Sequence, residues 1–142
     1  MLSLSLAQQL KKAGLEWQPQ LHDMFAIPDR ELDDRRFVLT EVMAYIELFR
    51  GSPMVTFHGT AEWALDYILQ TEAVWIPTES QLRERIQQLA SGLVLKQTAG
   101  GYECALDYGG ESLVFGGGGA CEVYGSALLQ LLWRQDANPG MN

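Results

Sequence analysis

The side chains best placed to do chemistry in this 142-residue chain are those of His58, Glu62 and Asp66. His58-Gly59-Thr60 stands where a predicted strand passes into a predicted helix, and both carboxylates follow along that helix. Backbone N–H groups at a helix start can hold an anion, and a histidine oriented by a carboxylate can act as a general base. No serine or cysteine nucleophile has a clear position nearby. We therefore expect a hydrogen-bonded structural histidine.

A second candidate is the charged segment of residues 29–36, which resembles a loop for a hard cation. An EF-hand calcium loop needs glycine at its sixth position and a bidentate glutamate at its twelfth. Counted from Asp29, these positions hold aspartate and threonine, so no metal site is expected. We expect a solvated loop, with a partner-recognition loop that uses Asp29, Arg30 and Asp33 as the alternative.

Four consecutive glycines, Gly116 to Gly119, precede a predicted helix and could suggest a phosphate loop. Such a loop also needs a lysine and a hydroxyl residue, and these are missing here. A dinucleotide site would need a parallel βαβ unit, yet only one helix and a tail follow. We expect a flexible connector and no cofactor.

The four tryptophans could stack on a ligand or anchor a partner. Trp63, Trp75 and Trp133 lie within apolar runs, which are typical of the core. Trp17 is flanked by polar residues and is the best candidate for an exposed aromatic side chain.

Composition narrows the class of partner. Ten basic and eighteen acidic residues give a formal charge of −8, which disfavours nucleic acid and anionic membranes as partners. No run approaches the ~20 apolar residues of a membrane span. Lys11 and Lys12 follow the leucine-rich start, whereas a signal peptide carries its positive charges first. Two cysteines, Cys104 and Cys121, are too few for a secreted disulfide scaffold, so we expect two reduced, buried thiols in a cytoplasmic protein.

Periodicity and capping residues predict four helices. Three of them cover about residues 4–13, 61–69 and 120–134. The remaining helix begins at a capping box formed by Thr78 and Gln81 and is expected to stop at Gly92. Runs of β-forming residues predict strands over 37–39, 54–57, 73–76, 93–97, 102–107 and 112–115. Residues 24–27 form a short apolar run, and residues 43–49 fit either a buried strand or a helix.

The last third of the chain is the clearest. Gly100-Gly101 and Gly109-Gly110 predict tight turns between three strands, whose apolar face the terminal helix covers. The fold class is therefore α+β, with mainly antiparallel strands and a C-terminal β-β-β-α unit. We expect one domain over residues 1–135 and a flexible tail over 136–142.

Two stretches also resemble a known family. The first consists of Leu10-Lys11-Lys12-Ala13-Gly14-Leu15-Glu16-Trp17 and, a few residues later, Phe25-Ala26-Ile27-Pro28-Asp29-Arg30. The second consists of Thr56-Phe57-His58-Gly59-Thr60-Ala61-Glu62-Trp63, followed by Trp75-Ile76-Pro77. The family consists of small uncharacterised bacterial proteins, some of them labelled pilus-assembly proteins, and the resemblance covers about residues 3–90. It implies a bacterial cytoplasmic origin and supplies no catalytic residues.

The sequence thus favours a non-enzymatic accessory or protein-interaction module of the bacterial cytoplasm, with a protein or a second copy as its partner. The alternative is a small-ligand-binding protein or hydrolase with its site around His58, Glu62 and the loop of residues 29–34. Six residues are candidates for a ligand or partner site: Trp17, Asp29, Arg30, Asp33, His58 and Glu62.

Overall fold

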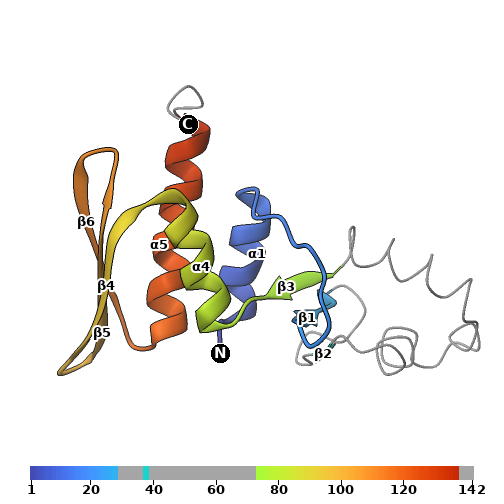
Figure 1. Cartoon of the computed structure of the whole chain (residues 1–142). Helices are drawn as coiled ribbons and strands as arrows, with labels where there is room; N and C mark the ends of the chain where they lie inside the picture. The colour runs from blue at the N-terminus through green and yellow to red at the C-terminus, as the bar shows by residue number, and fades with distance from the viewer. Residues whose placement is uncertain (29–36, 39–72, 138–142) are drawn as a thin grey trace, which may run out of the picture. The chain divides into compact units, whose positions relative to one another are not determined.

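The computed structural model describes residues 1–28, 37–38 and 73–137 (Figure 1). Within these ranges it contains three helices and two three-stranded antiparallel sheets, which confirms the α+β class. The chain forms two compact units, Met1–Glu16 with Pro77–Asn142, and Trp17–Ile76. That residues 1–135 form a single domain stays a prediction.

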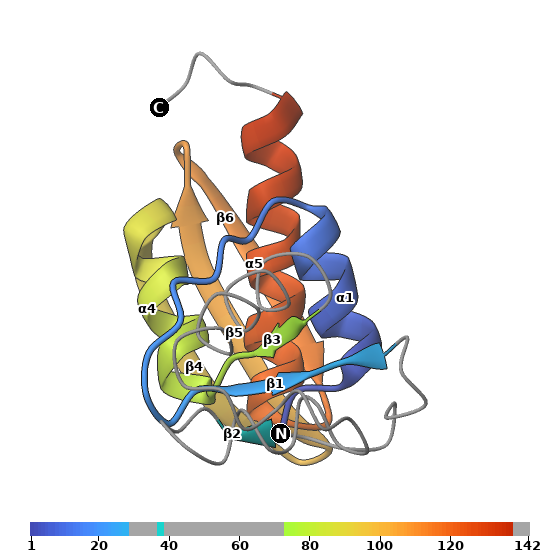
Figure 2. The same ribbon diagram turned by 90° about the vertical axis from the view of Figure 1, so that its right-hand side faces the viewer.

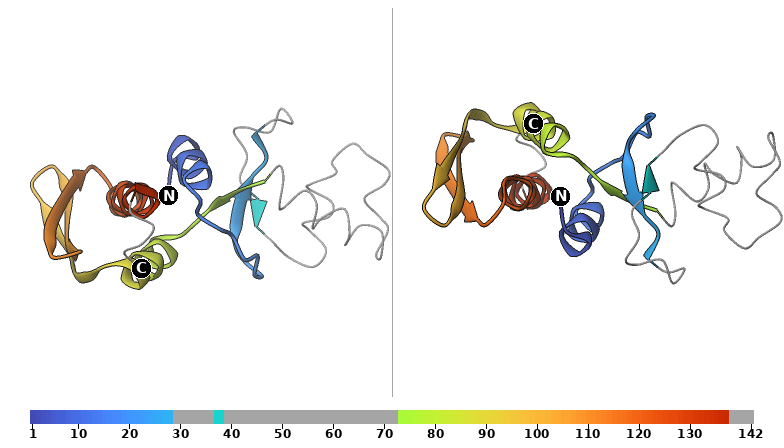
Figure 3. Two further views of the ribbon diagram at one scale, coloured as in Figure 1. Left: turned by 90° about the horizontal axis from the view of Figure 1, so that it is seen from above. Right: turned by 90° about the horizontal axis from the view of Figure 1, so that it is seen from below.

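The first unit contains the helices α1 (Leu4–Lys12), α4 (Glu79–Leu89) and α5 (Ala120–Ala137). Its sheet has the strand order β4 (Ser91–Thr98), β5 (Gly101–Tyr108), β6 (Glu111–Gly117). Figure 2 shows α5 flanked by α1 and α4. Figure 3 shows α5 between the sheet and α1, and this long helix contacts both of them.

Capping residues set both ends of α1. Ser3 is the N-cap and its Oγ accepts a hydrogen bond from the Leu6 N–H at 3.3 Å. At the other end Gly14 has φ +103° and donates to the Lys11 carbonyl, while Leu15 donates to the Leu10 carbonyl. These two bonds form the glycine-dependent cap that the sequence predicts.

The predicted capping box at the start of α4 is confirmed. Gln81 N–H donates to Thr78 Oγ1 at 3.2 Å, and Thr78 N–H donates to Gln81 Oε1 at 2.9 Å. The predicted stop at Gly92 is wrong, because the helix ends at Leu89 and Ala90 caps it. Gly92 lies instead in β4 with φ +60°, where an added Cβ would stand 2.5 Å from Asp107 Oδ2.

The C-terminal β-β-β-α unit is present. Gly109-Gly110 joins β5 to β6 as predicted, and α5 packs on the sheet. The turn predicted at Gly100-Gly101 lies one residue earlier, at Ala99-Gly100, because Gly101 already pairs with Thr98 as the first residue of β5. Gly116 and Gly117 extend β6, opposite Glu103 and Tyr102, so only the last two of the four glycines form the connector that was expected. The terminal helix reaches Ala137 and so includes the first two residues of the expected tail.

The second unit holds a smaller sheet, in which β1 (Met24–Ala26) lies between β2 (Phe37–Val38) and β3 (Val74–Ile76). The Trp17 ring stacks on Trp75 at 6.4 Å and lies 5.5 Å from the Phe25 ring. The other elements expected between residues 39 and 72 lie outside the described residues: the helix over 61–69, the strand over 54–57 and the segment 43–49.

Candidate functional site

Only one of the six predicted site residues, Trp17, lies in the described part of the chain. Asp29, Arg30, Asp33, His58 and Glu62 fall at positions outside it. The site around His58 and Glu62 therefore stays a prediction.

Trp17 is half-buried, which corrects the expectation of an exposed side chain. Its indole Nε1–H donates to Asp23 Oδ2 at 2.8 Å, and the same oxygen accepts the Gln20 N–H at 3.0 Å. The Asp23 side chain is itself buried, at 5% exposure. Both the polar edge and the ring of Trp17 are thus engaged within its own unit, so the residue acts there as a structural anchor.

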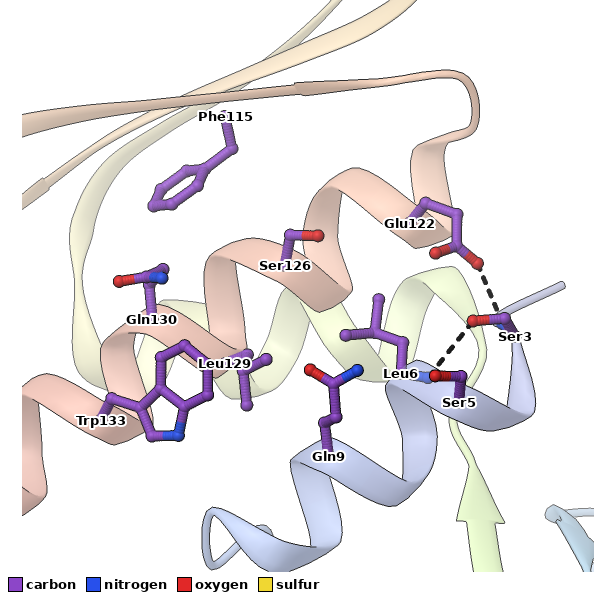
Figure 4. Close-up of a pocket in the computed structure, with 10 residues that line it drawn as sticks. All are labelled: Ser3, Ser5, Leu6, Gln9, Phe115, Glu122, Ser126, Leu129, Gln130 and Trp133. Atoms are coloured by element: carbon purple, nitrogen blue, oxygen red, sulfur yellow. Dashed lines mark hydrogen bonds between the residues drawn. The ribbon is translucent and has the colours of Figure 1, made fainter.

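The first unit carries a groove of about 520 Å³ between α1, α5 and β6 (Figure 4). This volume is within the range of ligand sites, about 300–1,000 Å³. Its lining comes from the start of α1, from one face of α5 and from one residue of β6: Ser3, Ser5, Leu6 and Gln9; Glu122, Ser126, Leu129, Gln130 and Trp133; and Phe115.

Helical spacing brings the α5 side chains of the groove onto one face. Glu122, Ser126, Leu129 and Trp133 follow one another at intervals of three or four residues, so they line up along the helix. On α1, Ser5 and Gln9 are also four residues apart. Figure 4 shows these two helix faces turned toward each other, with amide and hydroxyl groups around apolar side chains.

One charge lies in the groove. Of its ten lining residues, Glu122 alone is ionisable, and its Oε1 accepts the Ser3 N–H at 2.9 Å. This bond also ties the start of the chain to α5. Because none of the described residues that line the groove is a lysine, arginine or histidine, its electrostatics favour neutral or positively charged groups over anions.

The expectation that Trp133 lies in the core is wrong, because its side chain is 48% exposed. The buried face of α5 includes Leu128 and Leu131, whereas Trp133 shares the groove face with Ser126 and Leu129. The polar residues Ser126 and Gln130, seven and three positions before Trp133, are the signal in the sequence that could have indicated this face.

The two cysteines are both free, as predicted, but only Cys104 is buried; Cys121 is half-buried. Burial raises the pKa of the Cys104 thiol. Burial is also the main reason why the pKa of Tyr124 is raised, and the positive charge of Arg83, together with a hydrogen bond to it, partly opposes this rise. A buried, protonated thiol is a poor nucleophile, so Cys104 is not a candidate for nucleophilic catalysis.

No family model, curated protein or solved structure matches this chain. Among the described residues, no group of three or more His, Cys, Asp or Glu side chains could hold a metal ion. None of the described helices is both long enough and apolar enough to cross a bilayer.

Proposed function

We propose that the protein is a non-enzymatic protein-interaction module of the bacterial cytoplasm, and that it binds a short peptide segment of its partner in the groove between α1 and α5. The observation that carries this proposal is the combination of an exposed Trp133 with a groove of about 520 Å³. Exposed aromatic side chains beside a concave surface are frequent anchors of protein–protein contacts.

The groove lining indicates the chemistry of the bound segment. Trp133 and the half-buried Phe115 offer apolar surface, and the surrounding serines and glutamines can bond to the main chain of a peptide. The Glu122 carboxylate favours a basic residue next to the apolar anchor. The occupant that fits best is therefore a neutral or basic segment with one large apolar side chain.

Charge and resemblance support the rest of the proposal. A net charge of −8 disfavours nucleic acid and anionic membranes as partners. The resemblance of residues 3–90 to small bacterial proteins supports a cytoplasmic setting. The alternative, a small-ligand-binding protein or hydrolase with its site around His58, Glu62 and the loop of residues 29–34, stays a prediction from the sequence.

The proposal is tested by selecting a random peptide library on the purified protein. Selected peptides should combine a Leu, Phe or Trp with a Lys or Arg, and binding should fall at least about tenfold in Ser126→Arg, which places a long cation in the middle of the groove. Gln87→Arg, on the exposed side of α4, adds the same charge elsewhere and should leave binding unchanged.

Glu122→Gln separates charge from shape in the same experiment. The amide oxygen can still accept the Ser3 N–H, so the fold is retained while the carboxylate charge is lost. Basic peptides should lose affinity for this variant and neutral peptides should keep it. Selected peptides that bind Ser126→Arg as well as wild type, or a selection with no enrichment, would overturn the proposal.

A further inference from the structure

The larger sheet has two edge strands, β4 and β6, and each pairs only with β5 among the strands that the structure describes. Among these strands, the outer edge of β6 is therefore open. On the sheet face away from α5, Val94, Ala105 and Val114 stand in register across the three strands. Val94 and Val114 are 57% and 61% exposed, so an apolar row ends at the open edge.

The opposite edge, β4, carries features that hinder strand pairing. Its register shifts between Ser91 and Val94, and it presents Lys96, which is exposed. Bulges and lysines are common ways in which proteins protect a sheet edge. β6 has neither over its seven residues, and its pairing with β5 runs without a shift.

The turn before β6 determines which backbone groups reach the open edge. Gly109 and Gly110 have φ values of +57° and +82°, as a two-residue type I′ turn requires. Such a turn closes with a hydrogen bond between its first and fourth residues, Tyr108 and Glu111. Hydrogen-bonded and non-hydrogen-bonded pairs alternate from there along an antiparallel ladder.

Because of this alternation, the backbone N–H and C=O groups of the odd-numbered residues of β6 point toward β5. Those of the even-numbered residues point toward the open edge. The even-numbered residues are Ser112, Val114 and Gly116, and Val114 is the centre of the strand. The free N–H and C=O groups are therefore arranged symmetrically about one residue.

We propose that two copies of the chain pair through β6, antiparallel, with Val114 opposite Val114 of the second copy, to make one continuous six-stranded sheet. In this register the hydrogen-bonded pairs are Val114 with Val114 and, twice by symmetry, Ser112 with Gly116. A two-fold axis at Val114 relates the copies, and the interface is self-complementary.

The side chains fit the same register. Glu111 would lie opposite Gly117 of the second copy, so no like charges face each other, and its Oε2 already accepts the Arg134 Nη1–H at 2.9 Å. Leu113 and Phe115, both half-buried, would pair across the interface on the inner face. On the outer face the apolar row would continue through Val114 into the second copy.

Pairing at β6 would place both α5 helices, and hence both grooves, on the same side of the extended sheet. A partner with two binding segments could then engage both sites at once, and its avidity would exceed the affinity of one groove.

The oligomeric state tests the proposal. Light scattering on the full chain should give twice the 15.9 kDa of the monomer, with dissociation on dilution. Val114→Lys, which places two ammonium groups at the axis, should raise the dissociation constant at least about tenfold. Val94→Lys is the matched control, because Val94 is equally exposed in the same row but lies on β4. Circular dichroism should show that both variants stay folded.

Cross-linking tests the register, in a Cys121→Ser background. Val114→Cys should form an intermolecular disulfide, because Cα atoms of a hydrogen-bonded pair lie about 5.5 Å apart, within the range that a disulfide spans. Ser112→Cys should not, because the two positions would lie about 14 Å apart along the strands. A wild-type monomer at submillimolar concentration, equal effects of the two lysine variants, or equal cross-linking at 112 and 114 would each overturn the proposal.

Discussion

Gly125 of α5 lies directly against Leu6 of α1: a Cβ added to Gly125 would stand 2.7 Å from Leu6 Cδ2 and equally close to Leu2 Cδ1. A glycine inside a helix is otherwise unfavourable by about 1 kcal/mol relative to alanine. Its absent side chain is what lets α1 approach α5 closely.

Gly125→Ala should therefore destabilise the protein, although alanine is the better helix former. Overpacking costs about 1–3 kcal/mol and the helix propensity returns about 1, so a net loss of about 1 kcal/mol is expected in urea unfolding. Ser126→Ala, on the neighbouring helix position, is the control and should change stability by less than about 0.5 kcal/mol. In a Leu6→Ala background the cost of Gly125→Ala should shrink, because the colliding Leu6 methyl group is gone while the one of Leu2 remains.

Trp17→Phe tests the buried indole–carboxylate bond. The ring is largely kept, while the buried Asp23 carboxylate loses one of its donors, and a loss of about 1–3 kcal/mol is expected in chemical unfolding. Trp133→Phe, at an exposed position, should stay within about 0.5 kcal/mol of wild type. Equal stability of the two variants would contradict the structural role of Trp17.

Alkaline pH should weaken the fold through Cys104. Because burial raises the thiol pKa in the folded protein, the unfolded chain loses this proton first. Stability is complete below the unfolded thiol pKa of about 8.5 and falls as the pH rises through the folded value, by up to about 1.4 kcal/mol per pH unit.

Cys104→Ala should be less stable at neutral pH, because it leaves a cavity, but its stability should decline less between pH 8.5 and 10. Leu106→Val is the control: it perturbs the same buried face without a titratable group and should keep the wild-type slope. An unchanged slope in Cys104→Ala would show that Cys104 does not cause the decline.

The capping box of α4 should be worth a measurable part of the stability. Thr78→Ala removes the hydroxyl that accepts the Gln81 N–H, and a loss of about 1 kcal/mol is expected in thermal or urea unfolding. Thr78→Ser should restore most of it. Ser80→Ala, an exposed position in the same turn, should have little effect, and a similar loss there would argue against a specific cap.

The features predicted correctly from the sequence are those that neighbouring residues determine. The capping box of Thr78, the glycine cap at Gly14 and the turn at Gly109-Gly110 depend on backbone groups a few residues away. The groove could not be predicted, because it requires α1 and α5 to meet across most of the chain. The prediction that Trp133 is buried was wrong because α5 is apolar around much of its circumference. Periodicity therefore does not distinguish the buried face of this helix from the exposed one.

The hydrogen bond between Ser3 and Glu122 also has a consequence for synthesis on the ribosome, because its residues are 119 positions apart. At about 5–20 residues per second, α1 is made roughly 6–24 s before α5 can receive it. For that time the apolar face of Leu6 and Leu10 has no α5 to bury it, although both residues are buried in the finished fold. Helix α1 of the nascent chain therefore stays without this packing partner until α5 is made, and α1 is the segment on which we expect a ribosome-associated chaperone to act.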